Sequence, residues 1–162
     1  MSLPTDARRP KLNVNGREVD VGAHASTPLV YVLRNAVGLV GTKLGCGLEQ
    51  CGACAVLVDG RSVLTCNAPA GQFAGRDIVT IEATHDPLLQ EVKAVFADAG
   101  AAQCGYCIPG IVVAVTGLLK RIRHPGEREI REALRLHLCR CGTHSRVLEA
   151  VRALAAADED RS

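Results

Sequence analysis

The first half of the chain contains short segments in which hydrophobic and polar residues alternate, the pattern of half-buried β-strands. KLNVNGREVDV alternates on both sides of the Asn-Gly dipeptide at residues 15–16, which favours a type I′ turn and predicts a hairpin. AVLVDGRSVLTC predicts a second hairpin that turns at the Asp-Gly dipeptide of residues 59–60. DIVTIE, which begins at residue 77, predicts a further strand.

One short amphipathic helix is predicted between the two hairpins. Pro28 precedes it and Gly38 follows it, as expected for the first turn and the end of a helix. Its apolar residues recur at helical spacing and are Leu29, Val32, Leu33 and Ala36. Hairpins and one helix over residues 11–82 indicate a ubiquitin-like α+β domain.

After residue 82 the apolar residues recur at intervals of three and four, the pattern of amphipathic helices. Four segments show it: DPLLQEVKAVFADAG, IPGIVVAVTGLLKRIRH, EREIREALRLHL and SRVLEAVRALAAA. Gly, Pro or cysteine-containing loops separate them. We therefore predict an α+β protein with an N-terminal domain over residues 1–82 and a C-terminal four-helix bundle over residues 83–162.

Composition and charge limit the functions that this chain can have. Nineteen basic and 17 acidic residues give a net charge of only +2, and they are mixed along the sequence, so no nucleic-acid partner is expected. The four aromatic residues are too few for base-stacking platforms. No apolar run approaches the length of a membrane span, so no direct membrane span is predicted.

The N-terminal segment MSLPTDARRPKLNV lacks the apolar region of a secretory signal. Arg8 and Arg9 resemble half of a twin-arginine signal, but a polar strand rather than an apolar stretch follows them. We expect the chain to be made in the cytoplasm and to function there, or in the periplasm as part of a complex. Cysteines in a reducing compartment are metal ligands more often than disulfides.

Eight cysteines fall into two groups of four along the sequence. In the first group, Cys46, Cys51 and Cys54 have the spacing C-x4-C-x2-C and Cys66 follows one hairpin later, the ligand order of a plant-type [2Fe-2S] ferredoxin site. The predicted hairpin register places Cys54 opposite Thr65, and therefore next to Cys66. We predict that these four thiolates hold one [2Fe-2S] cluster.

The second group combines two short motifs at predicted helix ends. Cys104 and Cys107 lie in QCGYC before the second helix of the bundle, and Cys139 and Cys141 lie in LCRC between the third and fourth helices. Four thiolates from two loops can hold a second cluster. Disulfides are the alternative for all eight cysteines. Structural zinc is the alternative for the first group, although zinc sites favour paired C-x2-C motifs over its C-x4-C-x2-C spacing.

The strings GTKLGCGLEQCGACAVLVDG, QCGYCIPG and LCRCGTHSRVLEAV occur in this order and spacing. Together they resemble the two-[2Fe-2S] small subunit of the xanthine oxidase (molybdenum hydroxylase) family, and the resemblance extends from about residue 11 to residue 155. It implies a β-grasp, plant-type ferredoxin-like domain followed by a four-helix [2Fe-2S] domain. It also implies an electron-transfer subunit whose substrate chemistry takes place on another chain.

The resemblance implies an order for the two sites. Cys104, Cys107, Cys139 and Cys141 would form the proximal site, next to a molybdopterin (the cytosine dinucleotide form) held by a large subunit. Cys46, Cys51, Cys54 and Cys66 would form the distal site, which passes electrons outward. Gln103 and the loop at Cys141 would contact the pterin. The alternative for Gln103 is an exposed polar residue that caps the next helix.

Two motifs differ from the commonest family pattern. CGLEQCGAC and LCRCGTH resemble the small subunits of nicotinate dehydrogenase, isoquinoline 1-oxidoreductase and membrane-associated aldehyde dehydrogenases, in which a cytochrome c rather than a flavin subunit often accepts electrons. Leu48 stands where an acidic residue is common in the family, which suggests a different surface for the acceptor. The resemblance implies oxidative hydroxylation of an N-heterocycle or an aldehyde.

Motifs that would make this chain itself a catalyst are missing from the sequence. It has no nucleophile elbow, phosphate loop, dinucleotide fingerprint or metalloprotease helix, so no catalytic residue is predicted. His144 lacks the second spacing that a Rieske site requires and is expected at a helix N-terminus or an interface. The remaining histidines, at positions 24, 85, 124 and 137, are scattered and predict no site. An autonomous ferredoxin-like carrier and a zinc-stapled interaction module remain alternative functions.

Overall fold

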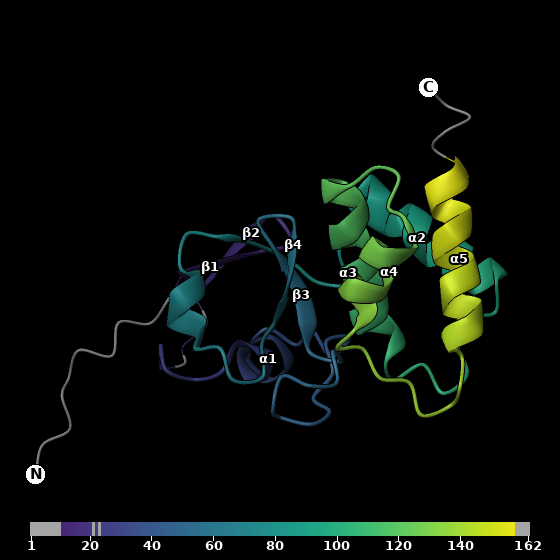
Figure 1. Ribbon diagram of the computed structural model, residues 1–162. Coiled ribbons are helices and arrows are strands. Elements are labelled where there is room, and N and C mark those ends of the chain that lie inside the picture. The colour runs from purple at the N-terminus through teal and green to yellow at the C-terminus, as the bar shows by residue number, and fades with distance from the viewer. Residues whose placement is uncertain (1–10, 21, 23, 158–162) are drawn as a thin grey trace, which may run out of the picture.

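The computed structural model describes residues 11–20, 22 and 24–157 of the chain. Arg8 and Arg9, considered above as part of a targeting signal, lie outside these residues. Figure 1 shows a sheet with α1 beside it on one side of the molecule, and the helices α2 to α5 on the other. None of the helices within the described ranges has the length and apolar character needed to cross a lipid bilayer.

The sheet has five strands, in the order β2-β1-β5-β3-β4. The strands are β1 (Lys11–Val14), β2 (Arg17–Asp20), β3 (Ala55–Val58), β4 (Arg61–Leu64) and β5 (Asp77–Val79). Two antiparallel hairpins, β1-β2 and β3-β4, are joined by β5, which runs parallel to β1 and antiparallel to β3. The predicted hairpins are therefore confirmed, and the predicted strand DIVTIE is shorter than its sequence pattern.

Both hairpin turns have the backbone conformation that the sequence predicts. The φ angles of Asn15 and Gly16 are 52° and 74°, and those of Asp59 and Gly60 are 48° and 77°. A type I′ turn requires positive φ at both central residues, and Asn, Asp and Gly adopt it at low cost. The second turn pairs Val58 with Arg61, the same register that predicts Cys54 opposite Thr65.

The helix between the hairpins lies where it is predicted but differs in geometry. It begins as α1 (Leu29–Tyr31) and continues as a π-helical segment, η1 (Val32–Ala36). The N–H of Val37 donates to the carbonyl oxygen of Val32 at 3.1 Å, a bond that spans five residues and widens the turn. A short 3-10 segment, η2 (Ala70–Phe73), which the sequence pattern did not predict, lies between β4 and β5.

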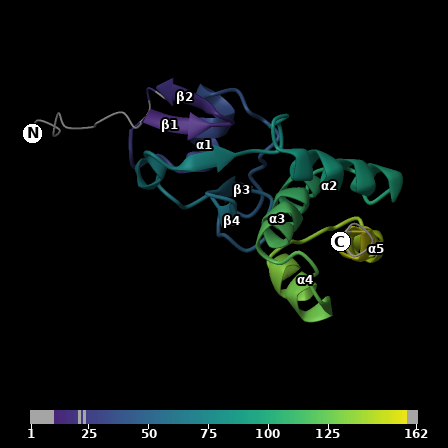
Figure 2. The same cartoon turned by 90° about the horizontal axis from the view of Figure 1, so that it is seen from above.

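Between residues 83 and 157, the last that the structure describes, the chain forms four helices, as predicted. They are α2 (Pro87–Asp98), α3 (Ile108–Arg121), α4 (Glu127–Leu134) and α5 (His144–Ala157). Figure 2 shows α3 and α2 next to the sheet and α5 on the far side. The central helix, α3, packs against β3 and β4 as well as against α2 and α4. It is therefore buried over most of its length.

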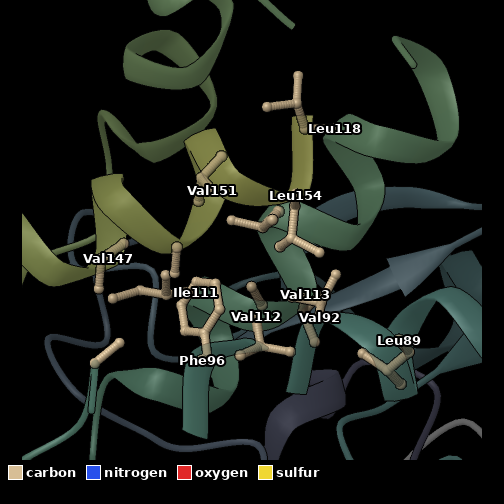
Figure 3. Close-up of a cluster of buried hydrophobic side chains, with 14 of the residues drawn as sticks. Leu89, Val92, Phe96, Ile111, Val112, Val113, Leu118, Val147, Val151 and Leu154 are labelled. Carbon is tan, nitrogen blue, oxygen red and sulfur yellow. The ribbon is translucent and has the colours of Figure 1, made fainter. Parts of the chain in front are cut away.

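Two large hydrophobic cores, together with a small cluster of Val30, Cys54 and Cys66, hold the described elements together. The smaller core lies between α1, η1 and the sheet, and includes Leu12, Leu33 and Ile78. The larger core includes Leu57 and Val79 of the sheet together with side chains from α2, α3 and α5, which converge in Figure 3. Sheet and bundle therefore share one packed interior, which fixes the position of the loops at their junction.

Candidate metal centres

The first group of cysteines comes together in the long loop before β3 and at the end of β4. The thiol of Cys46 lies within hydrogen-bonding reach of Cys51, and that of Cys54 within reach of Cys66. Thr65 connects the two segments, because its N–H donates to the sulfur of Cys54 at 3.3 Å and its hydroxyl donates to the Cys54 carbonyl oxygen at 2.7 Å. The predicted contact between Cys54 and Thr65 is confirmed.

Backbone N–H groups of the loop point at these sulfur atoms. Leu48 and Gln50 donate to the sulfur of Cys46, each at 3.3 Å, and Glu49 donates to the sulfur of Cys66 at 3.3 Å. Positive φ angles at Gly47 (67°) and Glu49 (55°) turn the chain so that these groups face inward. Such N–H dipoles stabilise negative charge on thiolate sulfur, which is what a metal-bound thiolate requires.

The thiols of the first group respond differently to their surroundings. Desolvation opposes ionisation of Cys46, but the N–H groups of Gln50 and Leu48 outweigh it and lower the pKa to about 7. Burial raises the pKa of Cys66 to about 11, despite the N–H of Glu49. Gly45 lies so close to Cys51 that a Cβ there would stand 2.6 Å from the Cys51 sulfur, so only glycine fits.

The second group of cysteines comes together from the two helix-end loops. Cys104 lies within hydrogen-bonding reach of Cys141, and Cys107 within reach of Cys139, so each pair joins one loop to the other. Burial and the neighbouring Cys139 raise the pKa of Cys107 to about 12. The structure thus places these thiols at helix ends, as predicted.

Two residues at the start of α5 hold the LCRC loop in place. The Thr143 hydroxyl oxygen lies 3.1 Å from the sulfur of Cys139, and the N–H of Cys139 donates to Nε2 of His144 at 3.2 Å. Desolvation raises the pKa of Cys139, but hydrogen bonds from Thr143 outweigh it and lower the pKa to about 7. His144 is the first residue of α5, as expected, and it orients the backbone of the loop.

Both groups have the donor set of a [2Fe-2S] cluster, four cysteine thiols each. In the described part of the chain, no three His, Cys, Asp or Glu side chains are spaced to surround a single metal ion. A [2Fe-2S] cluster divides its four ligands between two irons, so its ligands need not converge on one point. The residues present fit this group.

Comparisons with known proteins agree with this arrangement. Residues 12–78 match a family described as a 2Fe-2S iron-sulfur cluster binding domain, and residues 80–152 match a [2Fe-2S] binding domain. A nicotinate dehydrogenase subunit of Pseudomonas putida is 46% identical over 145 residues, which cover 89% of this chain and 92% of that protein. The chain belongs to the xanthine oxidase family. It is an iron–sulfur, electron-transfer subunit of the molybdenum hydroxylase type.

Two further relatives support membership of the xanthine oxidase family. An isoquinoline 1-oxidoreductase subunit of Brevundimonas diminuta is 35% identical, over 85% of this chain and 91% of its own. The solved structure of quinoline 2-oxidoreductase from Pseudomonas putida 86 has a TM-score of 0.82 and 31% identity, and the match covers 94% of this chain and 96% of that one. The resemblance inferred from the motifs is therefore confirmed.

Two hydrogen bonds connect the loops of the two sites. The N–H of Leu138 donates to the carbonyl oxygen of Cys51 at 3.1 Å. The hydroxyl of Tyr106, in the QCGYC loop, donates to the carbonyl oxygen of Leu44 at 2.6 Å. These bonds hold the loops of the two sites against each other.

The sequence patterns did not predict the burial of His137, which lies where the loops of the two sites meet. His137 is only 6% exposed, and neither ring nitrogen makes a well-aligned hydrogen bond, although the Gly110 backbone lies within reach of the ring. A Cβ at Gly52 would overlap its ring, so Gly52 leaves room for it. Burial lowers the pKa of His137 to about 4, against the opposing effect of the Gly110 backbone, and the ring is neutral near pH 7. In the sequence, only its position two residues before Cys139 marks it as a neighbour of the helical site.

Gln103 and Cys104 lie at the surface of the iron–sulfur subunit, and both are exposed. Gln103 is thus an exposed polar residue, as the alternative expects, but the N-cap residue of α3 is Cys107 rather than Gln103, and the Cys107 side chain makes no cap hydrogen bond. At the other site, Cys46 is exposed and Leu48 beside it is 63% exposed. Each group of thiols therefore has one edge open to a partner.

Proposed function

We propose that this chain connects a molybdopterin-binding large subunit, at its helical site, to an external electron acceptor at its ferredoxin-like site. The observation that carries this proposal is the pair of exposed edges, at Cys104 and at Cys46, joined through the contacts of Leu138 with Cys51 and Tyr106 with Leu44. A subunit that relays electrons needs an accessible site at each end and a rigid connection between them.

We assign the ligands as two sets of four. Cys46, Cys51, Cys54 and Cys66 hold the distal cluster, and Cys104, Cys107, Cys139 and Cys141 hold the proximal cluster. When bound, the two [2Fe-2S] clusters supply one-electron oxidation and reduction. The N–H groups of residues 48–50 and 65 stabilise the thiolates of the distal site, and Thr143 does the same for Cys139.

The helical site is the end that we assign to the large subunit. Gln103 and Cys104 are exposed there, and so are two large apolar side chains, Tyr106 (48%) and Leu138 (62%). Exposed apolar residues around a metal site indicate a surface that a partner covers. We propose that Gln103 and the loop at Cys141 contact the pterin of the partner, in its cytosine dinucleotide form.

The distal site is the end that we assign to the acceptor, a cytochrome c or a flavin subunit. Leu48 and Val40 expose 63% and 56% of their surface on the loop that carries Cys46, so two apolar side chains stand beside this site. A relative named for nicotinate is 46% identical, whereas two relatives named for aldehydes are 36% and 37% identical, which favours an N-heterocyclic substrate over an aldehyde. The clusters are proposed to be loaded in the cytoplasm, and the complete complex to function there or in the periplasm.

EPR spectroscopy of the reduced native complex tests this proposal. Two distinguishable [2Fe-2S] signals and about four irons per chain are expected. A single signal, or none, would contradict the two-site assignment. A chain that is stable and monomeric with both clusters would favour the autonomous carrier, and bound zinc without visible absorption would favour the interaction module.

A further inference from the structure

A small apolar pocket opens between α2 and α3, beside the helical site. Its volume is about 240 Å³. Seven apolar residues line it, and one charged residue, Lys93, stands among them. The apolar residues are Ile81, Phe96, Ala97, Ala102, Ile108, Pro109 and Val112. Phe96 and Val112 also belong to the larger core, and Figure 3 shows them next to each other, so these walls are rigid.

The pocket is continuous with the exposed edge of the helical site. Ala102 lies two residues before Cys104, and Ile108 and Pro109 directly follow Cys107. The QCGYC loop therefore begins and ends at the wall of the pocket. A partner that covers this loop has to extend over the pocket as well.

Lys93 gives the pocket a polar edge. Its ammonium group donates a long hydrogen bond, 3.4 Å from Nζ to the carbonyl oxygen of Ala83. The nearby carboxylate of Glu82 accepts from the N–H of Gly41 and the hydroxyl of Thr80. Desolvation lowers the pKa of Lys93, against the attraction of Glu82. An acceptor oxygen beside the ammonium group would offset this partial desolvation.

We propose that this pocket is an anchor for the large subunit, which inserts an apolar side chain between α2 and α3 and places an acceptor oxygen, carboxylate or carbonyl, against Lys93. The inference rests on the proposed function, because it takes the partner at the helical site to be the large subunit. Apolar side chains that fill preformed pockets next to a functional site dominate the stability of many interfaces. The pocket therefore determines assembly, whereas the cysteines determine cluster content.

Two tryptophan variants on α2 test the anchor. Ala97 and Ala94 are both exposed on this helix, but only Ala97 lines the pocket. Ala97→Trp fills the pocket from within the chain and is expected to weaken binding of the cognate large subunit at least tenfold in size-exclusion or surface-binding measurements. Ala94→Trp, the matched control, is expected to bind like the wild type. Equal binding by both variants would overturn the inference.

Charge reversal tests the polar edge of the same pocket. Lys93→Glu is expected to weaken assembly, and Arg121→Glu, at the far end of α3 and outside the pocket, is not. If Lys93→Glu assembled normally, the acceptor oxygen beside Lys93 would be ruled out. Iron content and both EPR signals are measured on every variant. A wild-type chain without these irons and signals would contradict the proposed function. Normal clusters in Ala97→Trp together with normal binding of the large subunit would contradict only the anchor.

A photocrosslinking amino acid at position 97 of the full chain identifies the occupant. A crosslink to the large subunit supports the inference. A crosslink to a second copy of this chain, or within the chain itself, would overturn it, and so would the lack of any crosslink in the assembled complex.

Discussion

The N–H of Leu138 and the carbonyl oxygen of Cys51 form a hydrogen bond of 3.1 Å. Cys51 belongs to the first group of thiols, and Leu138 directly precedes Cys139 of the second. One hydrogen bond therefore links the backbone at the two candidate metal centres. The same contact holds the loop after α4 against the loop before β3.

Removal of this hydrogen bond is expected to separate electron transfer from cluster binding. Leu138→Pro lacks the donor N–H, so the free energy of unfolding should fall by about 1 kcal/mol and reduction of the distal cluster by substrate should slow. Leu138→Ala keeps the donor and serves as the control. Stopped-flow spectroscopy and iron analysis check both variants. Wild-type kinetics in the proline variant would show that this hydrogen bond is not needed for transfer.

Two glycines of α3 are expected to respond differently to alanine. At Gly110 a Cβ would overlap the carbonyl oxygen of Gly52, whereas at Gly117 it would stand 3.1 Å from Leu57 and from the N–H of Ser62. Gly110→Ala forces the helix away from the distal loop and should cost about 1–3 kcal/mol of unfolding free energy. Gly117→Ala needs only a small shift, which the better helix propensity of alanine offsets by about 1 kcal/mol.

Urea unfolding of the cluster-loaded chain measures both glycine variants. The difference between them tests whether the close approach of α3 to residue 52 is a real constraint. Equal stabilities of Gly110→Ala and Gly117→Ala would show that the distal loop adapts easily.

Cysteine-to-serine variants are expected to separate the two sites. Cys54→Ser should lose the cluster of the sheet domain, about two of four irons, and Cys107→Ser should lose that of the bundle. Each variant should keep one EPR signal, because the thiols of each group contact one another within the group. Equal loss of both clusters from every variant would contradict two independent sites.

Asp86 connects the start of α2 to α3. Its carboxylate accepts from the N–H of Leu89 at 3.2 Å, and it pairs with Nζ of Lys120 at 2.9 Å while only 7% of the side chain is exposed. Asp86→Ala removes both the helix cap and the ion pair, so we expect a loss of about 1–3 kcal/mol in thermal or urea unfolding. Asp86→Asn keeps an acceptor for the cap and should cost less.

The same carboxylate makes a pH-dependent contribution with a defined sign. Burial alone would raise the pKa of Asp86, but Lys120 and the N–H of Leu89 outweigh it, and the pKa is lower than the ordinary value. The contribution is therefore complete above the unfolded pKa of about 3.9 and is lost as the pH falls through the lower folded value. The stability difference between the wild type and Asp86→Asn should be constant from pH 8 to 5 and shrink below about pH 4. A difference that shrank already near pH 6 would contradict this assignment.

The sequence pattern predicted those elements whose local residues specify their geometry. The turns at residues 15–16 and 59–60 need positive φ, and Asn, Asp and Gly supply it, so both hairpins were predicted with the correct register. The π-helical turn over Val32–Ala36 was not predicted, because the apolar spacing of α- and π-helical turns is too similar in a segment of this length.

The candidate sites show the same division. Cysteine spacing and hairpin register brought Cys54, Thr65 and Cys66 together in advance. The burial of His137 was not predicted, because its neighbours Gly52 and Gly110 are distant in the sequence. The apolar pocket at Lys93 depends in the same way on how α2 packs against α3.

By itself, the sequence determined the approximate positions of the two hairpins and the four helices, and the division of the thiols into two groups, because turn conformation, hydrophobic period and cysteine spacing act over short stretches of chain. Only the tertiary structure decided how the two sites meet. The bond between Leu138 and Cys51, the buried ring of His137 and the pocket beside the helical site all form where the bundle packs on the sheet. These contacts depend on side-chain volumes in a shared core, which local patterns do not specify.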